Sequence, residues 1–448
     1  MAQTPRRIAA IAILAFRETV RSRLVASTAL AVAGAIAVVR RATGGTDGAA
    51  FHNFTFYSLA AVEAILCVAA LVAAAAAISG ETRAKTLQLA RVKPVPMFQL
   101  LMGRWIGLCA SLALILAAAM AAVRLVAPQP VPERCSARIR PVLPSVREVA
   151  EETVAMAIRG GETNQTELSA IRRDALAKLP FATVAFSPGE ALNFRFTLPK
   201  PLDASRPMML EVAFASDSYS SKPLSVVCAI RRADASRSNT GAEVANSDVE
   251  VAITNITARQ LVIPVDTARL GGATELALTM RHGGAEGQMP VMLQPRQSLA
   301  ILVPEHATSV NFIRAFLVLM PLLAMLAALG LALGSLFSLP VASFCAVGLA
   351  LSVLSAGYSV SDPDILEFED AMPPTALQRV TREMSVIVVR SIDFVARTAT
   401  EPEPATMLAD GIAVEGAEAV RSLAWNGLAL PLTMLAVAAF VLERKELP

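Results

Sequence analysis

Few residues in this 448-residue chain have the types and the spacing that catalysis or metal binding requires. The histidines His52, His282 and His306 are far apart, and none has a second histidine or a cysteine three or four residues away, so they do not predict a metal site. The five cysteines form no Cys-x-x-Cys pair, and no Gly-x-Ser-x-Gly motif supplies a nucleophile. We therefore expect no catalytic residue, no metal and no cofactor, and we predict that the chain is not an enzyme.

Glu63 is the acidic residue inside the long apolar stretch Phe54–Ile78. A charged side chain in the middle of a bilayer costs about 2.5–3.5 kcal/mol on insertion scales. One interpretation is that Glu63 lines a solvated path or binds a substrate cation. The other is that Glu63 is protonated or paired with a neighbouring helix, and the sequence leaves both open.

Two cysteines, Cys135 and Cys228, fall in a segment that we expect outside the cytoplasm, where disulfides form. A disulfide between them is therefore one possibility. The alternative, which the sequence favours, is that Cys228 is a core residue of a β-strand. Cys67, Cys109 and Cys345 fall in apolar stretches, and we interpret them as small packing residues.

The segment Gly80-Glu-Thr-Arg-Ala-Lys85-Thr86 is weakly similar to a phosphate-binding loop. It lacks the glycine before the lysine, and no buried β-strand precedes it, so we exclude nucleotide binding here. Any ATP hydrolysis that drives this protein must then come from a partner.

The composition indicates a membrane protein, because 54% of the residues are hydrophobic and only 17% are charged, against roughly 25% charged in soluble proteins. The net charge of +3 is too small to indicate nucleic-acid binding. A bilayer crossing needs about 20 apolar residues. Five or six segments qualify: the short Leu24–Val39, then Phe54–Ile78, Leu100–Ala127, two parts of Phe312–Leu354 that meet at Ser335–Pro340, and Leu423–Leu442. We expect six crossings. In the fourth, Gly330-x-x-x-Gly334 allows another helix to approach closely.

We predict an α-helical polytopic membrane protein with about six transmembrane helices and a large extracytoplasmic α+β insert that contains a β-sandwich. The expected parts are a cytoplasmic interfacial helix (1–23), three transmembrane helices with a cytoplasmic loop at 80–98 (24–127), an extracytoplasmic domain (128–310), transmembrane helices four and five (311–360), an extracytoplasmic helical segment (361–422), and the sixth helix with a cytoplasmic tail (423–448).

The insert begins with a helical pattern over residues 145–178 and then changes to alternating apolar and polar residues, which is typical of half-buried strands. Seven such alternations occur: Leu192–Leu198, Leu210–Phe214, Val226–Ile230, Val249–Ile253, Leu261–Val265, Leu276–Met280 and Leu299–Val303. Turn signals such as Pro188-Gly189 and Gly271-Gly272 separate them. Seven or eight short strands at this spacing predict an antiparallel β-sandwich.

Basic residues in short loops set the orientation of a membrane protein. They gather in the N-terminal segment (Arg6, Arg7, Arg17, Arg21, Arg23), in the loop at 80–98 (Arg83, Lys85, Arg91, Lys93) and after the last span (Arg444, Lys445). We therefore expect a multi-pass protein of the cell's inner (cytoplasmic) membrane with both termini in the cytoplasm.

The N-terminal segment has two interpretations. Arg6-Arg7 before Ile8–Phe16 could belong to a signal peptide, but the basic cluster Arg17–Arg23 and the lack of a convincing cleavage site argue against it. We favour a helix in the lipid interface with its arginines toward lipid phosphates.

Three local patterns together resemble the permease subunits of type-2 ATP-binding-cassette (ABC) exporters, particularly the group associated with multi-copper enzyme maturation. The first is an amphipathic helix at Ile8–Arg23 that leads into the first span. The second is the loop after the second span, which contains Gly80-Glu81, Thr86-Leu87 and Lys93-Pro94-Val95 and continues to Gly103-Arg104-Trp105-Ile-Gly107. The third is the sequence Arg444-Lys445-Glu446-Leu447 after the last span. Two features depart from the family: Lys85 replaces a usual glycine, and the insert after the third span is unusually large.

The resemblance implies a permease that pairs with a second permease subunit and binds cytoplasmic ABC ATPase subunits. It implies that the loop at 80–98 couples ATP hydrolysis to the membrane helices through Glu81, Arg83, Lys85, Thr86, Leu87, Arg91, Lys93 and Pro94. The expected function is export or cell-envelope work, with lipid and protein partners and no nucleic acid. The alternatives are a membrane-anchored adhesion protein whose β-sandwich binds glycan or envelope protein, and an ATPase-coupled subunit that transmits force without transport.

Overall fold

The computed structural model of the chain describes residues 3–44, 48–83, 96–128, 133–144, 146–159, 168, 171–172, 184–215, 225–233, 249–254, 260–283, 291–338, 340–345, 348 and 403–444. The chain divides into two compact units, one of Met1–Glu133 with Ala307–Pro448 and one of Arg134–His306. We call them the helical unit and the sheet unit. Most of the loop expected at 80–98, most of the expected fifth span and residues 361–402 of the helical segment expected over 361–422 lie outside the described residues.

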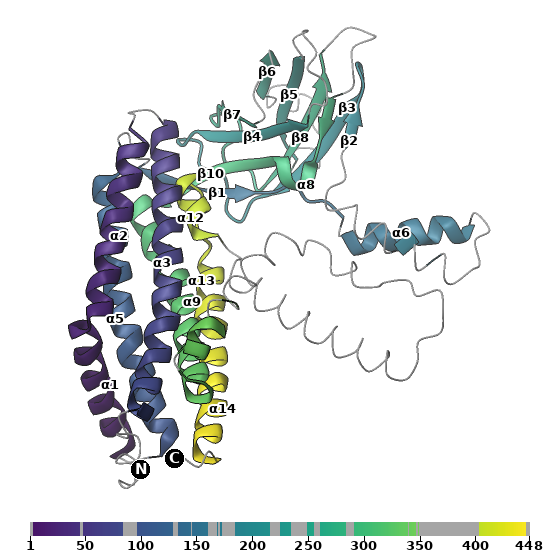
Figure 1. The fold of residues 1–448 in the computed structure, drawn as a ribbon. Helices are drawn as coiled ribbons and strands as arrows, with labels where there is room; N and C mark the ends of the chain where they lie inside the picture. The colour runs from purple at the N-terminus through teal and green to yellow at the C-terminus, as the bar shows by residue number, and fades with distance from the viewer. Residues whose placement is uncertain are drawn as a thin grey trace. The chain divides into compact units, whose positions relative to one another are not determined.

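The helical unit contains α1 (Gln3–Arg21), α2 (Arg23–Ala42), α3 (Gly48–Arg83), α5 (Met97–Val126), α9 (Thr308–Leu336), α12 (Pro404–Ala409), α13 (Gly416–Ala424), the π-helical turn η5 (Trp425–Ala429) and α14 (Leu430–Arg444) (Figure 1). In the described part of the chain, five helical stretches are long and apolar enough to cross a membrane: Arg23–Ala42, Ala50–Ser79, Met97–Val126, Thr308–Leu336 and Gly416–Arg444. They match the expected spans one to four and six and indicate a membrane protein, as the composition predicts.

Helices α3 and α9 pack against each other through the glycine pair of α9. A Cβ atom on Gly330 would lie 2.6 Å from the carbonyl oxygen of Leu71, and one on Gly334 would lie 2.7 Å from that of Ala75. Ser79 also donates a hydrogen bond of 3.4 Å to the carbonyl oxygen of Gly334. The close approach predicted from the Gly-x-x-x-Gly spacing is confirmed, and its partner is α3.

Helix α9 meets the last helix where both depart from regular α-helical hydrogen bonding. Pro321 lies inside α9 and lacks a backbone donor, and η5 is a single π-helical turn. A Cβ atom on Gly427 of η5 would lie 3.5 Å from Cβ of Pro321. One turn away, Ser422 donates a hydrogen bond of 3.2 Å to the carbonyl oxygen of Val318. The turn of α9 at Pro321 and the π-helical turn η5 therefore pack against each other.

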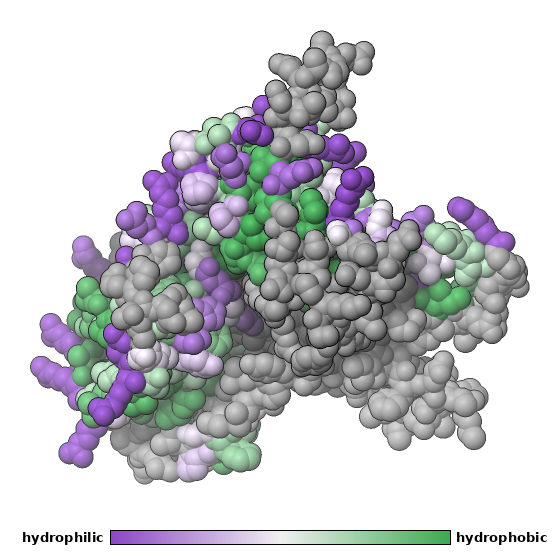
Figure 2. Space-filling view, turned by 90° about the horizontal axis from the view of Figure 1, so that it is seen from above, coloured by the Kyte–Doolittle hydropathy of each residue, from purple (hydrophilic) through white to green (hydrophobic). Residues whose placement is uncertain are grey.

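Large apolar side chains remain exposed on the outside of the helical unit. Leu30 and Val38 of α2 are 75% and 67% exposed, and Val437 of α14 is 61% exposed. In the space-filling view, such residues appear as green atoms at the surface of this unit (Figure 2). Exposed apolar surface on helices of this length is expected where lipid is the solvent.

In its described residues, the sheet unit contains α6 (Val146–Arg159), the four-residue turn α8 (Pro295–Ser298) and ten strands, most of which are labelled in Figure 1. The strands are β1 (Arg134–Ile139), β2 (Val184–Phe186), β3 (Ala191–Thr197), β4 (Met208–Ala215), β5 (Ser225–Arg232), β6 (Val249–Thr254), β7 (Gln260–Val265), β8 (Glu275–His282), β9 (Val291–Leu293) and β10 (Leu299–Ala307). One sheet has the order β1-β10-β4-β9-β2, with β7 also paired to β4, and the other has the order β3-β8-β5-β6.

The two sheets are built from antiparallel pairs and share one apolar core. The register places Leu210 opposite Ile301 in the first sheet and Cys228 opposite Met280 in the second. All four of these side chains are fully buried and belong to one cluster with Phe194 and Phe196 of β3 and others. The period-two patterns therefore identify which faces of the strands are buried.

All seven strands expected from alternation are present, and three others were not predicted. Strands β2 and β9 have three residues each, which is too short for an alternating pattern to be recognised. Strand β1 has the sequence Arg-Cys-Ser-Ala-Arg-Ile, in which small and charged residues weaken the alternation. The turn signals are confirmed at Gly189 and Gly272, whose φ angles are +88° and +79°.

Cys228 lies on β5 as a free thiol, so the disulfide with Cys135 is not formed in the structure. Cys228 is a core residue of a strand, which is the alternative that the sequence favours. Cys135 is also buried, on β1 of the other sheet.

Burial makes a prediction for the reactivity of Cys228. Loss of solvent raises the pKa of its thiol from 9.0 to about 12, so at neutral pH its thiolate fraction should be about a thousandfold below that of an ordinary thiol. With the other cysteines replaced by alanine, maleimide should label Cys228 only after denaturation. The control is the same background with Cys228→Ala and an exposed cysteine at Lys200→Cys, which should label in the folded protein. Equal labelling rates at the two positions would contradict the assigned burial.

Candidate functional site

The N-terminal helix pair changes direction at Ser22. The Thr19 carbonyl oxygen ends α1 by accepting hydrogen bonds from the Ser22 backbone N–H at 3.0 Å and from the Ser22 hydroxyl at 2.7 Å. Ser22 has extended backbone angles, and its hydroxyl oxygen accepts a hydrogen bond of 3.3 Å from the N–H of Val25, so it caps the start of α2. A single serine therefore ends one helix and starts the next.

Helix α1 is docked along the first turns of α5 through two glycines. A Cβ atom on Gly103 would lie 2.7 Å from Cβ of Ile11. One on Gly107 would lie 2.5 Å from the carbonyl oxygen of Ala12 and 2.7 Å from Cβ of Ala15. Only glycine permits this approach, so Gly103 and Gly107 are the residues that attach α1 to the third span. The position of α1 at a lipid interface stays a prediction.

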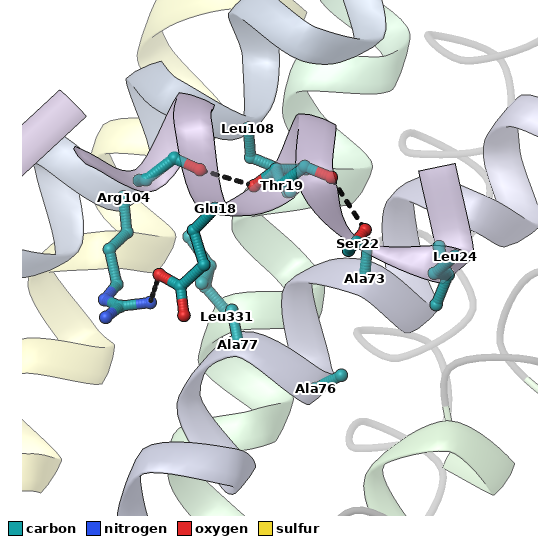
Figure 3. A pocket seen from close by; sticks show the side chains of 11 residues that line it. Glu18, Thr19, Ser22, Leu24, Ala73, Ala76, Ala77, Arg104, Leu108 and Leu331 are labelled. Carbon is teal, nitrogen blue, oxygen red and sulfur yellow. Dashed lines mark hydrogen bonds and ion pairs between the residues drawn. The ribbon is translucent and has the colours of Figure 1, made fainter. Parts of the chain in front are cut away.

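A pocket of about 210 Å³ lies where α1 meets α2 (Figure 3). Much of its wall is apolar and comes from Ala73, Ala76 and Ala77 of α3, Leu108 of α5 and Leu331 of α9. Glu18, Thr19, Ser22 and Arg104 contribute its polar atoms. The hydroxyls of Thr19 and Ser22 donate to the backbone carbonyls of Ala15 and Thr19, both at 2.7 Å, so Glu18 and Arg104 carry the charge of the pocket.

Glu18 and Arg104 point toward each other from α1 and α5 (Figure 3). Their nearest charged atoms, Oε2 and Nη1, are 3.9 Å apart, which is a loose ion pair. The Arg104 side chain is 13% exposed, whereas the Glu18 side chain is 66% exposed. The pocket therefore holds a buried cation beside an accessible anion.

This pocket lies between the two helices that flank the expected coupling loop. Glu81 and Arg83 belong to the last turn of α3, which ends at Arg83, and α5 begins at Met97. Lys85, Thr86, Leu87, Arg91, Lys93 and Pro94 lie outside the described residues. Both flanking helices contribute pocket residues, Ala77 from α3 and Arg104 from α5.

Glu63 lies in α3 and is half-buried. The charged group that acts on it is the carboxylate of Glu403, at the start of α12, which has the same sign. In the described part of the chain, no basic side chain forms an ion pair with Glu63. Both interpretations of Glu63 stay predictions.

The segment Glu403–Glu415 is fixed to the starts of α3 and α9. Nδ1 of His52 is 3.0 Å from Oδ1 of Asp410. The Asn311 side chain donates to the Ile412 carbonyl and accepts from the Val414 N–H, both at 2.7 Å and both buried. Two buried hydrogen bonds to one amide define the position of this segment against α9.

Comparison with protein-family models, curated proteins and solved structures finds no match to this chain. Among the described residues, no group of three or more His, Cys, Asp or Glu side chains is placed to hold a metal ion. The site is therefore interpreted from its own geometry and chemistry.

Two charged residues of the pocket can be recognised in the sequence. Arg104 interrupts the apolar run of the third span, and Glu18 is an acid in a basic segment. Each lies near the end of a helix, and only the docking of α1 on α5 brings the two together. Asn311 cannot be recognised in this way, because one asparagine in an apolar stretch has no distinctive spacing.

Proposed function

We propose that this protein is the membrane-spanning permease subunit of an ABC transporter of the type-2 exporter kind, driven by separate cytoplasmic ATPase subunits. The observation that carries the proposal is the arrangement around the expected coupling loop. The helix before the loop and the helix after it pack around one pocket, and α1 is attached by Gly103 and Gly107 to the first turns after the loop. A force applied to the loop would therefore move α1, α3 and α5 as connected rigid bodies.

The positions of the described helix ends support six crossings. Helix α1 begins and α14 ends at the same end of the helical unit, and α9 ends there too (Figure 1). The segment before α13 is fixed to the starts of α3 and α9, at the other end. We propose that the segment after Pro340 contains the further crossing, with both termini in the cytoplasm of a cell with an inner membrane. We also propose that the two sheets form a sandwich outside the cytoplasm and that a second permease subunit completes the transporter.

The proposal is tested by purifying the full chain in mild detergent and identifying what co-purifies by mass spectrometry. The native chain should bring down an ATPase with nucleotide-binding motifs. The double variant Glu81→Lys with Arg83→Glu should retain about a tenth or less of that ATPase, because reversing charges at an interface removes attraction and adds repulsion. The retained fraction is measured as the ratio of ATPase to permease peptides.

A matched control reverses an exposed acid and base elsewhere. Glu415→Lys with Arg421→Glu changes two exposed residues of α13 and its cap, which lie far from the loop in the sequence, and it should leave the ATPase ratio unchanged. Native complexes without an ATPase, or a double loop variant that keeps the full ratio, would rule out the coupling role.

The alternative of an extracytoplasmic binding protein has one observation in its favour. Met209 of β4 and Val262 of β7 are 39% and 50% exposed, and they flank the buried Glu211 on the face opposite the core. Exposed apolar side chains on a sheet face are a feature of binding surfaces. The test is the double variant Met209→Lys with Val262→Lys. If this variant loses an envelope partner but still binds the ATPase, the result would favour a binding protein or a subunit that transmits force. Transport by proteoliposomes would favour a permease.

A further inference from the structure

One side of α1 combines arginines with exposed apolar side chains. Arg17 and Arg21 are one helical turn apart, and both are exposed. Ile13 and Leu14 belong to the same side by their helical spacing, and they are 56% and 65% exposed. The sequence of α1 contains one acid, Glu18. This side of the helix, which we call the basic face, therefore presents positive charge together with apolar surface.

The basic face is not the face that docks on α5. Ala12 and Ala15 are buried, and both approach Gly107 of α5. The sequence predicts that the apolar run Ile8–Phe16 lies in the lipid interface, but the structure uses these two residues of the run for contact with protein. Any lipid beside α1 must therefore meet the side that carries the exposed arginines.

The short connection to α2 keeps these arginines near the membrane surface. Helix α2 has 20 residues and is therefore about 30 Å long, which matches the hydrocarbon core of a bilayer. Ser22 is the one residue between the two helices, and Arg17 is five residues before it, about 8 Å along the axis of α1 (Figure 1). The headgroup layer on each side of the core is about 5–8 Å thick. If α2 spans the core, Arg17 and Arg21 are therefore at the level of the lipid phosphates.

The charge of the basic face favours anionic lipids over zwitterionic ones. A guanidinium group can bind a phosphate through two parallel hydrogen bonds. Phosphatidylcholine also has a phosphate, but it carries a compensating ammonium group, whereas phosphatidylglycerol has a net negative charge. An arginine near an anionic membrane surface increases binding by about fivefold. The exposed Ile13 and Leu14 are suited to the glycerol and the first acyl carbons below the phosphates.

We propose that the basic face of α1 binds anionic phospholipids, with their phosphates at Arg17 and Arg21 and their first acyl carbons beside Ile13 and Leu14. The bound lipids hold α1 at the membrane surface from the side that α5 leaves exposed. The inference requires that α2 crosses a membrane, and it does not depend on coupling to an ATPase.

The test measures which lipids lie next to α1 in the full chain, reconstituted into proteoliposomes. The five native cysteines are replaced by alanine, and Leu14→Cys carries a bimane fluorophore. Phosphatidylglycerol and phosphatidylcholine with a spin label on the acyl chain are added in turn as quenchers. Phosphatidylglycerol should bind about thirtyfold more tightly at this position, about fivefold for each of the two arginines. High salt should reduce the preference, because exposed charges are screened.

Paired variants separate charge from other effects. Arg17→Gln with Arg21→Gln should remove the preference for phosphatidylglycerol at the Leu14→Cys label, whereas Arg17→Lys with Arg21→Lys should keep most of it. Both pairs change exposed side chains and should keep the native thermal midpoint, so a lost preference does not reflect unfolding. The control label is Leu114→Cys on α5, at a side chain that is 59% exposed and ten residues from Arg104 and from Arg124. The two lipids should quench it equally.

Two results would overturn the proposal. One is equal quenching by the two lipids at the Leu14→Cys label when Arg17 and Arg21 are intact. The other is quenching by neither lipid at this label while the Leu114→Cys label is quenched, which would show that protein covers the basic face. A missing ATPase partner would leave the lipid preference unchanged, so this proposal and the coupling role fail independently.

Discussion

Replacing Gly107 with leucine should release α1 from α5. A Cβ atom at this position would lie 2.5 Å from the Ala12 carbonyl oxygen and 2.8 Å from the Phe16 nitrogen, and both are backbone atoms that no side-chain rotation can move. Overpacking costs about 1–3 kcal/mol where side chains can adjust, so we expect about 3 kcal/mol or more here. The released helix should be cut by trypsin after Arg17 and Arg21 at a rate well above that of the native chain.

Gly34→Leu is the matched control for this prediction. Gly34 is an exposed helical glycine of α2, and a Cβ atom there would meet nothing within 4 Å. The substitution should leave the trypsin pattern unchanged and should not lower the thermal midpoint, because glycine is a poor helix former. Trypsin resistance of Gly107→Leu equal to that of Gly34→Leu would show that α1 is not held in this way.

Asn311→Ala should also cause a large loss of stability. The substitution removes both buried hydrogen bonds of the amide and leaves the Ile412 carbonyl and the Val414 N–H without that partner. Each buried polar group that loses its partner costs about 1–3 kcal/mol, so the loss should be about 2–6 kcal/mol. The thermal midpoint in detergent should fall, and the segment between α12 and α13 should become sensitive to proteases.

Asn193→Ala is the corresponding control at an exposed site. Oδ1 of Asn193 accepts a hydrogen bond of 2.7 Å from Thr279, the same length as those of Asn311, but water can replace it. We expect a change within about 0.5 kcal/mol. Similar midpoints for the two variants would mean that the Asn311 contacts do not hold the segment.

The sequence predicts different features in the sheet unit and in the helical unit. In the sheet unit, alternation predicts the strands and their buried faces, since Leu210 and Val212 point to the core and Met209 away from it. In the helical unit, the apolar runs predict where the helices lie but not their neighbours. The spans of α3, α5 and α9 are the most apolar of those described, so periodicity does not indicate which of their faces meets which helix.

The glycine pairs illustrate this limit. Gly330 and Gly334 predict a close approach, and the structure shows that the approaching helix is α3. Gly103 and Gly107 have the same spacing, but in the sequence they belong to the family pattern and do not identify α1 as the helix that approaches. A glycine in a helix indicates that another helix can pack closely there, and the rest of the fold decides which helix it is.

By itself, the sequence determined that the chain has membrane-length apolar helices, a strand-rich insert and a basic segment between two spans, because hydropathy, period and charge are local properties. Only the tertiary structure decided that α1 lies on α5, that Glu18 meets Arg104, and that Asn311 holds the segment after α12. These contacts join residues about a hundred positions apart, such as Asn311 and Ile412. Their formation depends on how whole helices pack, which no local pattern encodes.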